Sequence, residues 1–591
     1  MSDISADGDV KDKAADPEVV AEPKLFEESN AGDGTHREEH YLHGARLMLC
    51  LFSLYICTFL IALDQTIVIT IMQNVGNHFN ALNKVAWITT AFSFSMAVFM
   101  QIWGSVSIAI GRKVSLFLAV GLFELGSLLC GVSNTINMLI GGRVIAGFGG
   151  GGIQSLVMVI IAEVVPIERR PIAMAGLGVT FGLAMVLGPL IGGAFTTNAT
   201  WRWCFYINLP IGGLAAAVVF FVFHPPKPKG KILPKLLAID WFGLFLMVVG
   251  FTLFLLALSF GGNEFPWRSA AVILCFVLGG LFIGLFSLWN FKYSKNPLIP
   301  AEIVRVRAID LACLGLFAVF AYFMALVIYA ALYFQTLRGY SALIAGVSLL
   351  PTIIPMVIFS IGTGISTAKF RYIKPFTVFG GALGPLGCGL WCLLGVHSGL
   401  SLRIGCQIIF GIAVGTMMQP FIIHVQMAAP KTAGSTIIAS TLMNFARNLG
   451  AAVGSDLAQL VYTSTLSSKI RDLEGSAEYL SLGLDSYPLS QLTGDTSKIH
   501  TLPEPLKEMV LQVFMAAFKN VFYLSIGFAA IAFFCALCMP NVRLPKKSKG
   551  IDDSETEKDT KEKCDTAASE TSERDDGDGG DGGDGQRHEA D

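Results

Sequence analysis

Charged residues are scarce in this chain of 591 residues. Asp, Glu, Lys and Arg together make up 15% of it, hydrophobic residues make up 53%, and the mean hydropathy is +0.61. Soluble globular domains contain about 25% charged residues, so this shortage of charge excludes that class. The composition predicts a protein that crosses a lipid bilayer many times.

Motifs for several kinds of chemistry are also missing. The sequence contains no G-x-x-x-x-G-K-[ST], so we expect no ATP-binding loop. It contains neither His-Glu-x-x-His nor His-x-x-x-x-Asp, which argues against an enzyme embedded in the membrane. Cys535 and Cys538 form a C-x-x-C, but no second pair or histidine lies near them, so they do not predict a metal site. We therefore expect no catalytic residue, no metal, no cofactor and no nucleic-acid partner.

Long apolar runs are what the chain has in abundance. A run of about 20 apolar residues is long enough to cross the hydrocarbon core as a helix. The runs predict an all-α polytopic membrane protein with fourteen transmembrane helices, approximately at 47–72, 85–108, 114–133, 137–163, 172–195, 204–223, 238–260, 268–290, 308–334, 342–365, 375–396, 403–424, 435–463 and 520–540.

Charge is distributed unevenly along the chain. Residues 1–40 hold 12 acids and 4 bases and residues 550–591 hold 16 acids and 5 bases, so we expect cytosolic tails at 1–44 and 541–591 to be disordered. Between the spans, 21 lysines and arginines fall on one side and five on the other. Because basic loops stay in the cytosol, this places both termini there. The acidic segment 464–519 then lies outside, as a solvated loop or a ligand-binding lid.

The stretch 139–213 combines charge, glycine and tryptophan within apolar sequence. Arg143 lies on one face of a predicted helix with glycines at i+4 and i+8. A charge at this depth should point into the helix bundle and find a partner, and small residues let helices approach closely. The motifs of the stretch are Arg143-x-x-x-Gly147-x-x-x-Gly151, Gly178-x-x-x-Gly182, Gly188-Pro189-x-x-Gly192-Gly193 and the string WRWCFYINLP at 201–210.

These motifs resemble the signatures of the major facilitator superfamily. The WRWCFYINLP string, together with LDQTIV at 63–68, is similar to the fungal branch of fourteen-span drug:proton antiporters. The resemblance implies two six-helix bundles in parallel repeat, with the substrate between them and two inserted central helices. The bundles then occupy 45–223 and 308–540, and a linker with the inserted helices occupies 224–307. We expect a monomer in the bilayer that binds protons and a small-molecule substrate.

The sequence also repeats internally. The segment 140–151 aligns without a gap on 404–415, with a glutamine in place of the arginine. The glycine pair of 178–182 aligns, at a slightly different offset, on that of 450–454. Since only the first copy carries the arginine, ion chemistry is expected in the N-terminal bundle.

Asp64 and Arg143 are the main candidates for proton coupling. At about 1.5 Å per residue, Asp64 lies about 12 Å and Arg143 about 9 Å inside the outer ends of their spans, so the two side chains can meet. A carboxylate that exchanges a proton for an arginine is a coupling device, and a purely structural ion pair is the alternative. Glu124, near mid-membrane, is the third candidate, with structural pairing again the alternative.

Further candidates follow from the resemblance or from their place in a span. The motif Gly104-x-x-x-x-x-x-Gly111-Arg-Lys resembles an inner-gate loop, although Ile108 stands where the family has an aspartate, and its bases either gate or only set topology. The Gly-Pro turn is associated in the family with efflux, although close packing alone also explains the glycines. The inner-gate candidates are Arg112, Lys113, Glu163, Arg169 and Arg170; the antiporter motif is Gly182, Gly188, Pro189, Gly192 and Gly193; possible cavity residues are Gln65, Gln154, Asn208, Gln335, Gln407, Gln419 and Arg447; and Asn198 begins a glycosylation sequon.

We interpret the chain as a proton-coupled exporter of small apolar or amphipathic compounds, such as drugs, toxins or secondary metabolites, that works by alternating access. Its expected location is the plasma membrane, with the vacuolar membrane as the alternative. A proton symporter that imports a metal chelate or nutrient is the main rival, and a sensor that does not transport is another. No residue pattern identifies the substrate.

Overall fold

The computed structural model describes residues 40–81, 84–261, 265–475, 499 and 502–545. The chain divides into two units, Met1–Leu544 and Pro545–Asp591, and the fold below is that of the first. The two tails predicted to be disordered lie almost entirely outside the described residues.

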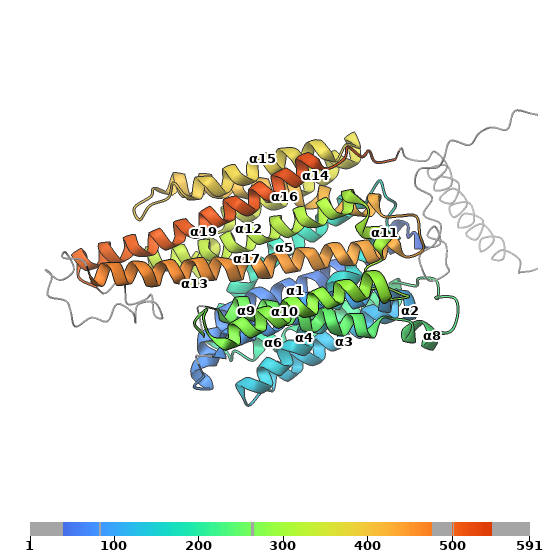
Figure 1. The fold of residues 1–591 in the computed structure, drawn as a ribbon, viewed down its shortest axis with the longest axis horizontal. Helices are drawn as coiled ribbons and strands as arrows, with labels where there is room; N and C mark the ends of the chain where they lie inside the picture. The colour runs from blue at the N-terminus through green and yellow to red at the C-terminus, as the bar shows by residue number, and fades with distance from the viewer. Residues whose placement is uncertain (1–39, 82–83, 262–264, 476–498, 500–501, 546–591) are drawn as a thin grey trace, which may run out of the picture. The chain divides into compact units, whose positions relative to one another are not determined.

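Helices build the described part of the chain, where two isolated bridges are the only β-structure (Figure 1). The predicted all-α class is therefore confirmed. The first half holds α1 (Gly44–His78), α2 (Ala86–Ile110), α3 (Arg112–Gly131), α4 (Ile136–Val164), α5 (Arg170–Asn198), α6 (Trp203–Tyr206) and α7 (Asn208–Val222). The centre holds α8 (Ile232–Leu237), α9 (Trp241–Phe260), α10 (Ala270–Leu288) and α11 (Ala301–Val304). The second half holds α12 (Arg307–Arg338), α13 (Ala342–Val347), α14 (Leu350–Phe370), α15 (Lys374–Trp391), α16 (Leu400–Ala428), α17 (Ser435–Glu474) and α19 (Glu504–Cys538).

Local chemistry sets where several helices begin and end. The side chain of Thr135 accepts a hydrogen bond from the backbone N–H of Met138 and so caps α4. Gly111 alone separates α2 from α3, and its φ of 94° is a conformation that glycine adopts without strain. α12 ends in the same way at Gly339, with φ 65°.

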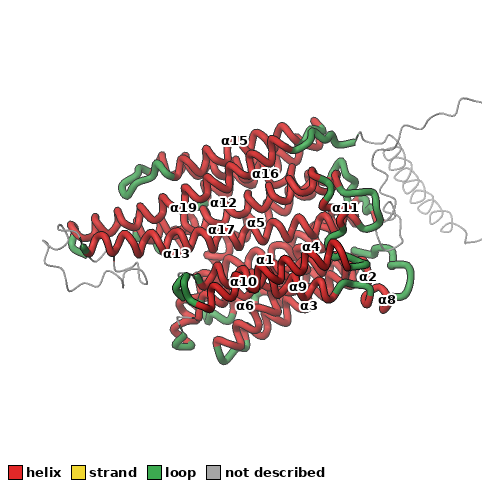
Figure 2. Tube along the Cα trace, in the orientation of Figure 1, coloured by secondary structure: helices red, strands yellow, loops and turns green. Residues whose placement is uncertain are grey.

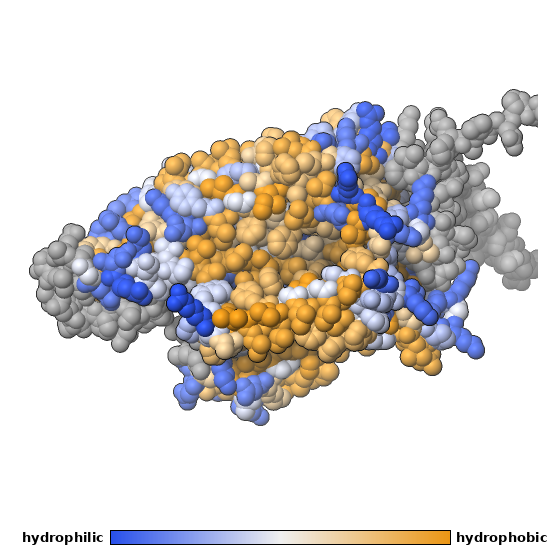
Figure 3. Space-filling model, viewed as in Figure 1, coloured by the Kyte–Doolittle hydropathy of each residue, from blue (hydrophilic) through white to orange (hydrophobic). Residues whose placement is uncertain are grey.

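Twelve helices of the described chain are long and apolar enough to cross a membrane. Figure 3 shows the matching surface, with hydrophobic residues over the middle of the visible face and hydrophilic residues toward both ends. The expected spans 375–396 and 435–463 fall on α15 and α17, which are not among the twelve. α15 is only 18 residues long and contains five glycines and two prolines, and α17 carries Arg447 and Asp456 among many small polar residues. Both compositions lower hydropathy, so the count of fourteen is not confirmed.

The two halves share one packing pattern, and their helices run along a common direction (Figure 2). In the first half α2 packs on α4, α1 on α5, and α3 on α4 and α7. In the second half α14 packs on α16, α12 on α17, and α15 on α16 and α19. The neighbours therefore recur in chain order. α9 and α10 pack on each other beside α2 and α17 and stand outside this repeat.

Glycines mark the closest approaches in both halves. A Cβ atom at Gly147 would overlap the carbonyl oxygen of Phe92 on α2. A Cβ atom at Gly411 would overlap the carbonyl oxygen of Thr352 on α14, the counterpart of α2. The alignment of 140–151 with 404–415 therefore joins positions with the same structural role.

The alignment of the glycine pair 178–182 with the pair 450–454 joins positions with different roles and is wrong. The glycines at 450 and 454 lie against the backbone of α12, the counterpart of α1. In the first half, Gly188 and Gly192 of α5 lie against α1, beside Thr66 and Thr70. Those at 178 and 182 face α14 of the other half instead. Two surfaces of α5 carry glycines four residues apart, and spacing alone does not indicate which of these surfaces packs on α1.

The segment 464–519 is more helical than the predicted loop. α17 continues to Glu474 and α19 begins at Glu504 (Figure 1), and most of the residues between them lie outside the described part of the chain. Each added part packs on the neighbouring helix: the ring of Phe518, in the added part of α19, lies 5.1 Å from that of Tyr462 on α17, and Nδ2 of Asn520 on α19 donates to Oγ1 of Thr465, in the added part of α17, at 3.1 Å. Contact between α17 and α19 stabilises these additional turns, and hydropathy along the sequence does not indicate such contact.

The two ends of the bundle differ in burial. The α8 end is defined here as the end that holds α8, α11 and Arg112. There every residue of α4 from Gly149 to Val164 is buried, whereas toward the opposite end α4 alternates between buried and exposed positions. α16 follows the same trend from 413 to 427. The two halves also contact each other at the α8 end, where Gln419 lies against Met174 and Gly104 against Thr441.

Candidate functional site

An aspartate and an arginine from different helices meet inside the first half. Nη1 of Arg143, on α4, lies 2.6 Å from Oδ2 of Asp64, on α1, and both side chains are almost completely buried. Either charge alone would be costly in an apolar bundle. The structure thus brings together the two residues that helix arithmetic placed at similar depth.

Arg143 is held on several sides. Its Nε donates to the carbonyl oxygen of Ile88 on α2 at 2.9 Å. Its guanidinium carbon lies 4.2 Å from the ring centroid of Phe92 and 5.9 Å from that of Phe205. Stacking on an aromatic face and one fixed hydrogen bond orient the planar guanidinium. Its remaining N–H groups are therefore aimed in set directions, one of them at Asp64.

The carboxylate of Asp64 has a donor on each oxygen. Oδ1 accepts from Nδ2 of Asn208 on α7 at 3.3 Å, and the same nitrogen lies 3.2 Å from Oγ of Ser127 on α3. Hydrogen bonds from donors to an ionised carboxylate are short and strong. Asp64 therefore joins α1 to α4 through Arg143 and to α7 through Asn208.

Glu124 lies in the same bundle but outside this network. It is half-buried on α3 and faces Gly212 of α7, where a Cβ atom would overlap its carboxylate. Neither carboxylate oxygen has a hydrogen-bond partner among the described residues. Glu124 therefore lies in the same helix bundle as Asp64 but takes no part in the hydrogen bonds between Asp64, Arg143 and Asn208.

A second buried ion pair closes the α8 end. Nε and Nη2 of Arg112, at the start of α3, lie 2.8–3.1 Å from the carboxylate of Glu163, near the end of α4. Nη1 of Arg112 also donates to the carbonyl oxygen of Ser107 at 3.2 Å. Both charged side chains are at most 4% exposed. The pair ties three successive helix ends together.

The other inner-gate candidates make different contacts. Nζ of Lys113 is exposed and donates to the carbonyl oxygen of Phe220 at 2.7 Å, so it joins α3 to α7. Arg170 is buried, and its Nε donates to the carbonyl oxygen of Val165 at 3.0 Å. Arg169 is the residue before α5, at the same end. Among the five candidates, Arg112 and Glu163 form a direct ion pair with each other.

We expect Glu163→Gln to destabilise the folded protein strongly. The amide leaves Arg112 buried without a counter-charge, and breaking a buried pair costs about 3–5 kcal/mol. Thermal unfolding of the purified protein in detergent measures the loss, with Glu302→Gln on exposed α11 as the matched control. An unchanged unfolding temperature in Glu163→Gln would contradict a structural role for the pair.

The proposed antiporter motif lies where α5 packs on α1. A Cβ atom at Gly188 would overlap Oγ1 of Thr66, and that hydroxyl donates to the carbonyl oxygen of Ala184 at 3.1 Å. Gly192 contacts α1 one turn further on, and a Cβ atom at Gly193 would meet nothing within 4 Å. Gly182 faces Val357 of α14. The motif therefore serves two interfaces, α1 and the other half.

Pro189 and Asn198 lie toward the end of α5 away from α8. Pro189 is inside the helix and packs near Gly346 of α13 in the other half. Asn198 is the last residue of α5 and is exposed. Exposure is compatible with the glycosylation hypothesis, which stays a prediction.

The possible cavity residues do not gather at one point. Asn208 joins Asp64, and Gln335 is half-buried on α12. The other glutamines each contact a neighbouring helix: Gln65 donates to Sδ of Met96 at 3.5 Å, Gln154 accepts from Asn448 at 3.5 Å, Gln407 accepts from Thr352 at 3.3 Å, and Gln419 donates to the carbonyl oxygen of Met174 at 2.9 Å. The Gln154 and Gln419 contacts cross between the halves.

Some residues of the site were not found from the sequence. Ser127, Phe92 and the carbonyl group of Ile88 carry no motif, because serine, phenylalanine and backbone groups occur throughout the spans. Phe205 and Asn208 had a signal, since both belong to WRWCFYINLP. That string supplies an aromatic face to Arg143 and an amide to Asp64.

The chain is similar to known transport proteins. Residues 54–455 match the family model described as Major Facilitator Superfamily. The chain is 33% identical to vacuolar basic amino acid transporter 5 of Saccharomyces cerevisiae, over 86% of this chain and 94% of that protein. It is 34% identical to efflux pump dotC of Dothistroma septosporum, over 84% of each. The solved structure of the proton:xylose symporter XylE superposes with a TM-score of 0.53 at 14% identity, over 84% of this chain and 96% of that one, which shows a shared fold.

Proposed function

Because the chain belongs to the major facilitator superfamily, whose members are membrane transporters and not enzymes, we propose that it exports small apolar or amphipathic compounds in exchange for protons. The observation that carries this proposal is the buried pair of Asp64 and Arg143. A buried carboxylate that gains a proton loses its attraction to the arginine, and this changes which helix arrangement is favoured.

The contacts between the halves at the α8 end support a cycle of alternating access. The halves meet there through Gln419 and Met174, and through Gly104, which lies against Thr441. Opening this end requires these contacts between halves to separate. Proton exchange at Asp64 and Arg143 would bias that opening from within the first half.

Fourteen spans and cytosolic termini form part of the proposal. α15 and α17 occupy the places in the second half that α3 and α5 occupy in the first, and α3 and α5 are among the twelve apolar helices. Equivalent packing supports counting α15 and α17 as spans, although their composition is polar. The basic residues that flank the helices favour a cytosolic α8 end.

Relatives favour export, in the plasma membrane or the vacuolar membrane. One is named an efflux pump, and another is named a vacuolar transporter of basic amino acids. Moving amino acids into a vacuole and pumping compounds out of a cell both carry substrate away from the cytosol. Import with protons, and a sensor that does not transport, are the rival functions.

Membrane vesicles that contain the protein test the direction and the coupling. A proton moving down about 100 mV and one pH unit releases about 3.7 kcal/mol, enough for roughly a 500-fold substrate gradient. We expect inside-out vesicles with an acidic interior to accumulate an amphipathic fluorescent compound, and a protonophore to abolish this. Accumulation only in right-side-out vesicles with an acidic exterior would instead establish import.

A further inference from the structure

Arg447 is a buried cation at the meeting of the two halves. It lies on α17, and the whole residue is 3% exposed. Its guanidinium carbon is 4.9 Å from the ring centroid of Phe320 on α12 and 5.8 Å from that of Phe181 on α5, in the other half. Two aromatic rings from opposite halves therefore border the group.

Arg447 differs from the other buried arginines in what its N–H groups meet. Arg112 and Arg143 pair with carboxylates, and Arg170 donates to a carbonyl oxygen. Among the described residues Arg447 has no carboxylate within ion-pair distance, and its Nε has no hydrogen-bond acceptor. The N–H groups of a guanidinium point outward in its own plane, so rings over its faces leave these donors unused. A buried cation in a membrane protein normally has a partner.

Nearby polar groups are also left open. Both amide atoms of Asn444, one turn before Arg447, lack partners among the described residues. Asn448, the next residue after Arg447, contacts Gln154 of the other half at 3.5 Å. Polar atoms that can bind a ligand therefore accompany the cation on α17.

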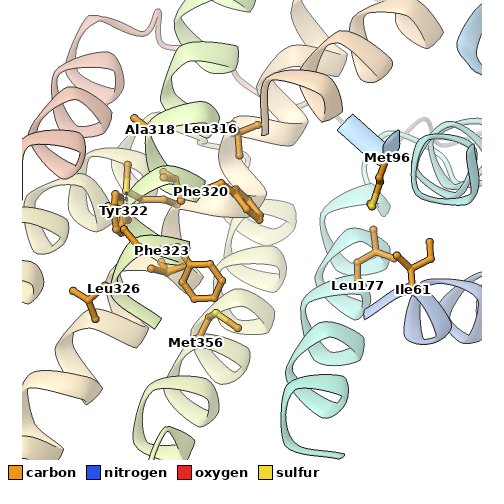
Figure 4. Close-up of a cluster of buried hydrophobic side chains, with 14 of the residues drawn as sticks. Ile61, Met96, Leu177, Leu316, Ala318, Phe320, Tyr322, Phe323, Leu326 and Met356 are labelled. Atoms are coloured by element: carbon orange, nitrogen blue, oxygen red, sulfur yellow. Dashed lines mark hydrogen bonds between the residues drawn. The ribbon is translucent and has the colours of Figure 1, made fainter. Parts of the chain in front are cut away.

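Apolar side chains of the first half lie opposite Phe320, one of the two rings beside Arg447 (Figure 4). Figure 4 shows the rings of Phe320 and Phe323 on the side of α12 that faces Ile61, Met96 and Leu177 of the first half. These side chains suit a planar apolar body, and methionine adapts to ligands of different shape. The proposed site thus offers aromatic and aliphatic side chains together with the unpaired guanidinium group of Arg447.

We propose that Arg447 binds the anionic group of the transported compound, and that the substrate class is organic acids with a planar apolar body. The carboxylate or phenolate contacts the guanidinium edge through charge-assisted hydrogen bonds, and the body lies against Phe181 and Phe320. This inference rests on the proposed function, since it names the substrate class of the proposed exporter.

The test measures binding of 1-pyrenebutyrate and its methyl ester to purified protein in lipid nanodiscs. The two probes share one apolar body and differ in charge. We expect wild type to bind the acid at least about tenfold more tightly than the ester, after subtraction of empty nanodiscs, because charge-assisted hydrogen bonds contribute about 1.5–3 kcal/mol, a factor of about 10 to 150. Arg447→Gln should remove this preference, Arg447→Lys should keep part of it, and Arg403→Gln, on the first turn of α16, should keep all of it.

Two outcomes would overturn the proposal: equal binding of acid and ester by wild type, or a preference that survives in Arg447→Gln. Thermal unfolding separates ligand binding from a structural role, because removing an uncompensated buried charge should leave the unfolding temperature unchanged or higher. A lower temperature would identify Arg447 as a structural anchor. Binding needs no proton gradient, so failed export in vesicles and a failed charge preference are independent results.

Discussion

Asp64→Asn is expected to reduce proton-driven export to the background of vesicles that lack the protein. An amide cannot bind and release the proton, so a cycle driven by Asp64 stops even if the substrate still binds. The variant keeps nearly the same volume, but its amide has one oxygen, so only one of Arg143 and Asn208 can still donate to it, and Arg143 loses its counter-charge. Folded protein should fall as well, so export is compared per folded molecule.

Transport rate per protein molecule at the membrane surface, measured as a function of external pH, distinguishes proton coupling through Asp64 from a purely structural ion pair. Asp310→Asn is the matched control, because Asp310 is exposed on the first turn of α12. A purely structural pair would lower the amount of Asp64→Asn protein in the membrane but leave the surviving molecules coupled, with an unchanged pH profile. That result would refute coupling through Asp64, and Glu124 would become the next candidate.

The Asp64 pair was predictable because charge inside spans is rare. Few carboxylates and arginines fall within the apolar runs, and the rise of a helix gives each a depth, so two charges of opposite sign at one depth can be matched from the sequence. The donor to the second carboxylate oxygen of Asp64 could not be predicted in the same way. Asn208 was indicated only by its place in a motif, and Ser127 belongs to no motif. Uncharged polar residues are too common in the spans for partners to be matched by depth.

Features that depend on packing were less accessible. α17 continues beyond its apolar run to Glu474 because it lies against α19, and that contact is formed by residues far apart in the chain, such as Thr465 and Asn520. The glycine spacing of α5 fits two surfaces, and only the structure shows that Gly188 faces α1 while Gly178 faces the other half. The spacing of glycines identifies a helix face made of small residues, but the helix that packs on this face is known only from the tertiary structure.

Valine at Gly147 or Gly411 is expected to prevent folding. At both positions a Cβ atom would overlap a backbone carbonyl oxygen of the neighbouring helix, Phe92 for Gly147 and Thr352 for Gly411. A backbone cannot rotate away as a side chain can, so the helices must separate and lose their packing. We estimate a cost of about 3 kcal/mol or more, at or above the upper end for overpacked sites.

Each variant has a matched control on its own helix. Gly141 on α4 and Gly405 on α16 have nothing within 4 Å of a built Cβ atom, so Gly141→Val and Gly405→Val should fold normally. The measurement is the fraction of protein that elutes as a single species from size exclusion in detergent, together with its unfolding temperature. If the two segments 140–151 and 404–415 are structurally equivalent, Gly147→Val and Gly411→Val should fail to a similar degree while both controls remain intact. A normal elution profile for Gly411→Val alone would show that α16 does not approach α14 as α4 approaches α2, and the repeat would then hold for chain order but not for helix packing.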